Sequence, residues 1–121
     1  MKLISIEPEI RPHIGIRREI KLNLTPLKQA KAIQISELRP DRAESYHTNK
    51  VGFTFCIVVT GWMNVHCAGE NYDLKEGQGI VFEPGERHRI NKGKGWMISI
   101  SSMDYDDLAT TWENGQKPAG A

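Results

Sequence analysis

The chain has 121 residues, of which 39% are hydrophobic and 26% charged, and its formal net charge is +1. This length fits a single domain with one hydrophobic core. The near-neutral charge gives no general attraction for nucleic acid, no apolar run approaches the ~18 residues of a membrane span, and two cysteines are too few for a disulfide framework. We therefore expect one globular domain whose partners are neither nucleic acid nor membrane.

The first residues do not have the pattern of a secretory signal. The chain reaches an acidic side chain at Glu7, too early for the apolar core that such a signal needs. A cytoplasmic location is the expectation that follows.

The first 24 residues alternate loosely between apolar and polar side chains, with interruptions at Pro8 and Pro12. The alternation predicts two short strands. The prolines favour a sheet edge, because proline has no N–H to donate to a neighbouring strand. Thr25 and Pro26 are the cap and first-turn residues typical of a short helix, which we expect to include Leu27–Ala30.

Residues 32–38 alternate cleanly and predict a strand with one solvent-facing side. Residues 53–90 carry the strongest β signal, with apolar runs and period-two alternation cut by Gly and Pro about every ten residues. This pattern predicts antiparallel strands in a sandwich or small barrel. Within it, we expect Gly61 to form a tight hairpin turn between two strands.

A two-residue turn at Gly61 and Trp62 would make Cys56 and Cys67 cross-strand neighbours. Two interpretations remain open for this pair. The thiols are either two small buried hydrophobic groups or, in an oxidising setting, the halves of a disulfide bridge.

Residues 96–101 predict the last strand of the barrel. Ser101–Leu108 then begins with hydroxyl groups followed by acids, which favours a short C-terminal helix. Residues 113–121 have too little apolar surface to fold, so we expect a disordered tail. The chain is predicted to be one all-β domain over residues 1–112, with its core in residues 32–101.

A motif appears where the β signal ends. Residues 77–91 begin with Gly, pass through Pro84 and Gly85, and reach His88 and Asn91. This spacing resembles the second motif of the cupin superfamily, in which Gly is followed by Pro-x-Gly, His and Asn. Here Pro84 and Gly85 are adjacent and Asn91 comes one residue early. The resemblance implies an antiparallel β-sandwich or jelly-roll barrel.

The first cupin motif has His-x-His, then Glu, then Gly. Counting back from Gly61 places the first His on His47, the second on Asn49 and the Glu on Thr54. The resemblance therefore implies that two of the four cupin metal ligands remain, His47 and His88. Loss of the carboxylate leaves the charge of an ion poorly compensated, so we expect no tightly bound metal, with a divalent transition metal on the two imidazoles as the alternative.

Our first functional hypothesis is a binding module that holds a sugar or small organic acid in the barrel cavity. Within the superfamily, the stretch from Tyr46 to Ser101 looks most like the sensory domain of arabinose-type regulators, which bind small effectors without metal. The resemblance implies a set of cavity residues that supply polar contacts and apolar walls: His47, Asn49, Thr54, Cys56, Met63, Phe82, His88 and Trp96.

The second hypothesis is an enzyme, either a metal-free epimerase or isomerase or a metal-dependent cupin that uses both histidines. In the metal-free case His88 or His47 would be the base, because histidine titrates near neutrality. The candidate acids are Tyr46, Tyr72 and Tyr105. A third hypothesis is structural, with both histidines bonded to backbone carbonyls and the cavity filled.

Two apolar regions of the predicted barrel need cover. They are the segment Ile14–Leu24 and the outward face that carries Trp62 and His66. We expect a homodimer that buries one of them.

Overall fold

The computed structural model describes residues 1–11, 15–17, 30–41 and 43–113. The predicted tail beyond residue 113 and the predicted short helix, apart from Ala30, lie outside these residues. Within them the chain forms ten strands and a 3-10 turn, in the order β1 Lys2–Ser5, β2 Glu9–Arg11, β3 Gly15–Arg17, β4 Ala32–Leu38, β5 His47–Asn49, β6 Thr54–Cys67, β7 Glu70–Lys75, β8 Gln78–Phe82, β9 Arg87–Ser101, η1 Tyr105–Asp107 and β10 Thr110–Trp112.

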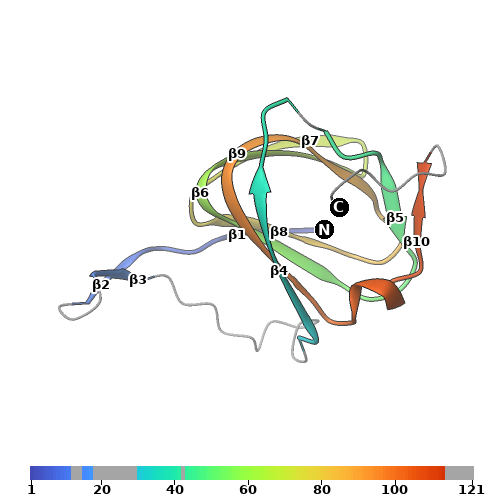
Figure 1. The fold of residues 1–121 in the computed structure, drawn as a ribbon, viewed down its shortest axis with the longest axis horizontal. Coiled ribbons are helices and arrows are strands. Elements are labelled where there is room, and N and C mark those ends of the chain that lie inside the picture. The colour runs from blue at the N-terminus through green and yellow to red at the C-terminus, as the bar shows by residue number, and fades with distance from the viewer. Residues whose placement is uncertain (12–14, 18–29, 42, 114–121) are drawn as a thin grey trace.

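Every strand pairing in the described residues is antiparallel. One sheet has the order β1-β8-β6-β9-β5-β10, with β4 joined to β9 and β7 joined to β6. This sheet curls into the barrel seen in Figure 1. The β2–β3 hairpin forms a separate two-stranded sheet and projects away from the barrel (Figure 1). The predicted all-β, antiparallel jelly-roll class is confirmed.

The predicted C-terminal helix is only a single 3-10 turn, η1. The side chain of Asp104 makes no capping hydrogen bond at the start of this turn, and Ala109 has a φ of 52° that redirects the chain. The backbone then enters β10, which pairs with β5. Glu113, the first residue of the expected tail, accepts hydrogen bonds from the Arg87 guanidinium.

The predicted hairpin turn at Gly61 is wrong. β6 continues through this position, and Gly61 lies directly opposite Gly95 of β9. A bulge between Val58 and Thr60 shifts the pairing register by one residue, which exchanges the two faces of the strand. That exchange explains why the side chains facing the barrel interior are even-numbered before the bulge and odd-numbered after it, a change that in the sequence resembles the start of a new strand.

The bulge also corrects the expected pairing of the cysteines. Cys56 lies opposite Ile80 and Ser99, whereas Cys67 lies opposite Glu70 and His88. Both are buried, free thiols. Of the two interpretations, the structure supports two small buried side chains.

Two apolar clusters cover the two faces of the curved sheet. The cluster inside the barrel consists of Leu38, Cys56, Val58, Met63, Val65, Cys67, Leu74, Ile80, Phe82 and Met97. The cluster on the outside consists of Phe55, Ile57, Val81 and Ile100. β6 contributes to both, so this strand is the element on which the packing of the domain depends.

We predict that Gly61→Ala destabilises the fold far more than Gly69→Ala. Both glycines have φ above +80°, which costs an alanine about 1 kcal/mol or more. At Gly61 a Cβ would also overlap the carbonyl oxygen of Lys94, while at Gly69 it would meet open space. Urea denaturation should show a loss of at least about 3 kcal/mol for Gly61→Ala and about 1 kcal/mol for Gly69→Ala. Equal losses would mean that the two strands do not approach closely at this point.

Candidate ligand-binding cavity

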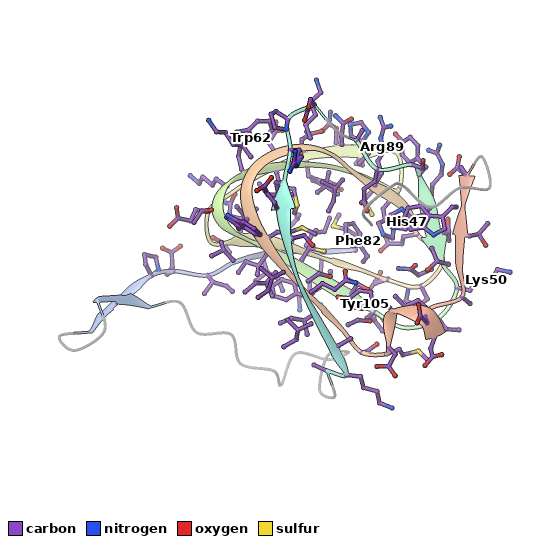
Figure 2. The ribbon with its side chains drawn as sticks, viewed as in Figure 1. His47, Lys50, Trp62, Phe82, Arg89 and Tyr105 are labelled. Atoms are coloured by element: carbon purple, nitrogen blue, oxygen red, sulfur yellow. The ribbon has the colours of Figure 1, made fainter. Side chains whose placement is uncertain are left out.

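The barrel encloses a cavity of about 860 Å³, in the size range of small-molecule sites. The side chains that line it come from five strands and the C-terminal segment, and Figure 2 shows His47, Phe82 and Tyr105 within the curve of the barrel. Most residues of the expected cavity set line it: His47, Asn49, Thr54, Cys56, Phe82 and His88. Of the structural hypothesis, the bonding of both histidines to backbone carbonyls is confirmed, whereas the expected filling of the interior disagrees with this cavity.

Two residues of the expected set are elsewhere. Met63 is fully buried in the inner cluster and does not reach the cavity lining. Trp96 is half-exposed and lies opposite Thr60 on the outside of the sheet. The alternation of β9 accounts for Trp96, because it shares a side of the strand with Ile98 and Ile100 of the outer surface, whereas Met97 and Ser99 face the barrel interior.

The two histidines of the cupin motifs lie side by side. His47 of β5 pairs directly with His88 of β9, and their ring centroids are 4.3 Å apart. Trp112 stacks on the free side of His47 at 4.1 Å, and Phe82 stacks on His88 at 3.9 Å. The imidazoles are therefore held in fixed orientations by an aromatic neighbour on each side.

Each imidazole is also anchored by its Nδ1 atom. Nδ1 of His47 donates to the carbonyl oxygen of Ser45 at 3.0 Å, and Nδ1 of His88 donates to that of Glu86 at 2.9 Å. A carbonyl oxygen can only accept, so Nδ1 carries the hydrogen and the neutral ring keeps its lone pair on Nε2. Both side chains can thus accept a hydrogen bond at Nε2.

His88 is held in its neutral form. Burial lowers its pKa to about 4, and the neighbouring His47 adds to the shift, while the bond to the Glu86 carbonyl opposes it. At neutral pH this side chain is a hydrogen-bond acceptor with no charge.

Further polar groups face the same cavity. The hydroxyl of Thr110 donates to Oδ1 of Asn49 at 2.6 Å, and the hydroxyls of Ser99 and Tyr105 are 2.7 Å apart. Thr54 Oγ1 is different. Among the described residues it is the buried side-chain oxygen or nitrogen without a hydrogen-bond partner. An unpartnered hydroxyl at a cavity wall is typical of a ligand contact.

The structure separates the three candidate tyrosines. Tyr105 lines the cavity, and burial raises its pKa. The hydroxyl of Tyr46 bonds to Nδ1 of His66 at 2.9 Å, away from the cavity lining, and Tyr72 packs against the inner cluster. Of the three, Tyr105 is the phenol able to reach a molecule in the cavity.

Sequence reasoning missed Trp112 and Ser99 as cavity residues. Trp112 belongs to a three-residue strand too short to be recognised by alternation, and it followed a segment that favoured a helix. Ser99 alternates with Ile98 and Ile100 in β9, so the strand period does place it on the face opposite those isoleucines. The signal for Ser99 was present, whereas Trp112 depends on the long-range pairing of β10 with β5.

The cavity thiol is not a nucleophile at neutral pH. Burial raises the pKa of Cys56 to about 12, and that of Cys67 to about 11. Since the thiolate is the reactive form, both groups act as apolar packing.

The donor set does not fit the four-ligand cupin metal site. Oδ1 of Asn49 already accepts from Thr110, and Thr54 offers a neutral hydroxyl where a carboxylate would be needed. In the part of the chain that the structure describes, no group of three or more His, Cys, Asp or Glu side chains is arranged to hold an ion. His47 and His88 are two imidazoles without the rest of that set.

The charged groups among the described lining residues are mostly acidic. Glu44 and Asp106 are acidic and Arg39 is basic, while Glu37, which borders the cavity, lies on the outer side of β4 opposite Trp96. The guanidinium of Arg39 is 2.9 Å from the carboxylate of Glu37, so its charge is largely compensated. A highly charged anion would find little compensation along this lining.

A curled antiparallel barrel with a ligand-sized cavity, and with histidines where the two cupin motifs place them, defines this protein as a cupin. The family model of the AraC-like ligand-binding domain matches residues 33–121, and the chain belongs to that family. Among the described residues there is no helix long and apolar enough to cross a membrane.

The solved structures similar to this chain include sugar isomerases. The WlaRB TDP-quinovose 3,4-ketoisomerase from Campylobacter jejuni has a TM-score of 0.79 and 16% identity, over 93% of this chain and 92% of that chain. A variant of the QdtA 3,4-ketoisomerase from Thermoanaerobacterium thermosaccharolyticum, in complex with TDP, has a TM-score of 0.77 and 16% identity, over 91% of this chain and 85% of that chain.

A dTDP sugar isomerase from Desulfovibrio desulfuricans has a TM-score of 0.75 and 12% identity, over 98% of this chain and 85% of that chain. At such identities the likeness shows a shared fold. No curated protein matches the sequence.

We predict that His88 makes the fold less stable in acid. Its folded pKa of about 4 lies below the ordinary value of 6.5, so between these two pH values the unfolded chain takes up a proton that the folded chain does not. The free energy of unfolding should therefore fall as the pH falls through this window, by up to about 3 kcal/mol at about 1.4 kcal/mol per pKa unit.

Urea denaturation of wild type and His88→Gln at a series of pH values measures this contribution as the difference between the two proteins. His66→Gln is the comparison variant, because His66 lies outside the cavity and its pKa is lowered separately, by burial and by the charge of Arg89. It should leave the acid dependence due to His88 in place. A wild-type profile parallel to that of His88→Gln would contradict the neutral, buried state of this ring.

Proposed function

We propose that this chain binds a small organic molecule in the barrel cavity, within the broad class of sugars and small organic acids, and does so without a tightly bound metal. Membership of the AraC-like ligand-binding family supports this proposal. The observation that carries it is the pair of imidazoles in the cavity lining, His47 and His88, each of which donates from Nδ1 to a backbone carbonyl and so leaves Nε2 as an acceptor for a ligand. Thr54 lines the same cavity, and its hydroxyl has no hydrogen-bond partner among the described residues.

The groups around Thr54 favour a ligand that carries several hydroxyls. Nε2 of His47 and of His88 can accept hydrogen bonds, and the amide nitrogen of Asn49 can donate them. The phenol of Tyr105 adds a group that can do either. Aromatic rings on both sides of the histidines provide the apolar walls that small-molecule sites commonly have.

The charged side chains of the cavity lining favour some sugars and small organic acids over others as the ligand. The carboxylates of Glu44 and Asp106, beside a guanidinium already paired with Glu37, favour an uncharged ligand over an organic acid or a nucleotide diphosphate. A neutral sugar is therefore the member of the class that we place first.

We predict that Thr54→Val weakens ligand binding while leaving the unliganded protein at least as stable. Valine has the shape of threonine but no hydroxyl, so it removes an unpaired buried group and gains up to about 1 kcal/mol of stability. Loss of one hydrogen bond to the ligand should lower affinity about tenfold.

Thermal shifts against a panel of neutral sugars, sugar acids and TDP would identify a ligand, and calorimetry would give its affinity for both proteins. Thr111→Val, on the exposed side of β10, is the matched control and should bind as wild type does. If Thr54→Val binds the identified ligand with unchanged affinity, or if the protein responds to no member of the panel, the proposed site is wrong.

A second candidate function is a metal-free sugar epimerase or isomerase. It is favoured by the presence in one cavity of a phenol, Tyr105, and two imidazoles, and by the activities named for the similar sugar ketoisomerases. In such a reaction His47 or His88 would take a proton from a carbon next to a carbonyl, and a second group would return it. The sequence hypothesis of His88 or His47 as base remains a proposal on this basis.

We predict that an enzyme of this kind would exchange substrate hydrogen with solvent. Incubation with keto-sugars and their TDP derivatives in D₂O should incorporate deuterium at the carbon beside the carbonyl. His47→Gln or His88→Gln should slow the exchange by about a hundredfold or more. NMR or mass spectrometry measures the label. A ligand that binds tightly and gains no deuterium would exclude this candidate and leave the binding function.

We also propose that two copies of the chain associate. Of the regions that the sequence left uncovered, the segment Ile14–Leu24 lies mostly outside the described residues. On the outward face with Trp62 and His66, His66 already has partners within its own chain, because its Nδ1 accepts hydrogen bonds from Tyr46 and Arg89.

A further inference from the structure

The outer side of β4 and β9 carries an exposed apolar surface. Ile33 and Ile35 of β4 keep 65% and 70% of their side-chain surface in solvent, and Trp96 of β9 keeps 46%. Isoleucine is among the most often buried residue types, so two adjacent isoleucines exposed to this degree in a strand are unusual. We call the surface formed by Ile33, Ile35, Trp96 and Ile98 the outer β4–β9 face.

The residues of this face form a continuous patch across the sheet. Ile35 lies directly opposite Ile98, and Ile33 lies directly opposite Ile100 of the outer cluster. Residues paired in this way point to the same side of a sheet. The exposed isoleucines therefore extend the buried outer cluster to the surface, and a contiguous apolar patch of this kind marks an interaction site.

β4 is also the margin of the sheet. Within the described residues it pairs with β9 on one side and with no strand on the other. An edge strand with a solvent-exposed apolar face is a surface that proteins usually cover.

The sequence of β4 is self-complementary. On the outer side of the strand the residues run Lys31, Ile33, Ile35 and Glu37. A two-fold axis at the level of Gln34 places Ile33 opposite Ile35 of a second copy, and Lys31 opposite Glu37. Both ends of the patch thus bring opposite charges together around paired isoleucines, as an isologous interface requires, with Lys31 joining a carboxylate that Arg39 of its own chain already contacts at 2.9 Å.

We propose that the outer β4–β9 face is where a second copy of this chain docks, with the two β4 strands antiparallel across a two-fold axis. This proposal rests on the proposed association of two copies and not on the nature of the ligand. It replaces the Trp62 and His66 surface as the interface.

Analytical sedimentation over a range of micromolar concentrations tests the interface. The wild type should sediment as a dimer, and Ile33→Lys/Ile35→Lys should weaken association about a hundredfold or more. Val51→Lys is the matched control, since Val51 is exposed outside this face, and it should remain dimeric. Circular dichroism checks that each variant is folded.

Charge reversal tests the two-fold arrangement and avoids placing charge in the apolar patch. Lys31→Glu alone and Glu37→Lys alone should each weaken the dimer, and Lys31→Glu/Glu37→Lys should restore it. Without restoration, the proposed two-fold register is wrong.

The outcomes distinguish the association of two copies from the choice of the surface through which they associate. A monomeric wild type would overturn the association of two copies. A dimer that survives Ile33→Lys/Ile35→Lys but dissociates in Trp62→Lys would keep the association and overturn the outer β4–β9 face as its surface.

Discussion

The close approach of β6 and β9 at Gly61 and Gly95 is the constraint on which the rest of the structure depends. At each of these positions a side chain would overlap the backbone of the opposite strand. The two longest strands of the domain can therefore stay paired while the sheet curls, and the bulge beside Gly61 exchanges the faces of β6. The first half of β6 then contributes side chains that line the cavity, and the second half contributes side chains of the inner apolar cluster.

The site is built at the end of the barrel where β5 and β9 pair. His47 and His88 meet there because they occupy directly opposite positions, and the carbonyl groups of Ser45 and Glu86 fix the hydrogen on Nδ1 of each ring. Aromatic stacking then fixes the planes of the rings. In cupins with a metal, two more ligands would complete this arrangement. Here Asn49 and Thr54 convert the same positions into hydrogen-bonding groups, which suits an uncharged polar ligand.

The parts of this structure that depend on local patterns could be predicted. Alternation identified most strands, and the turns at Gly69 and Gly85 coincide with positive φ values that glycine adopts easily. The spacing of the two motifs also predicted that His47 and His88 would face one cavity. The bulge in β6 could not be predicted from the sequence. An extra residue in one strand and a turn between two strands both move the apolar side chains from even-numbered to odd-numbered positions, so the two give the same pattern. Trp112 was missed since its place beside His47 depends on a pairing between strands far apart in the sequence.

The position of the cavity within the barrel links the stability of this domain to its ligand. Most of the strands contribute side chains to its lining, so a molecule that binds there binds the folded domain and not the unfolded chain, and it stabilises the fold by mass action. The folded fraction would then increase with the concentration of the ligand. In a cell that degrades unfolded chains, the abundance of this protein would follow the supply of the molecule it binds.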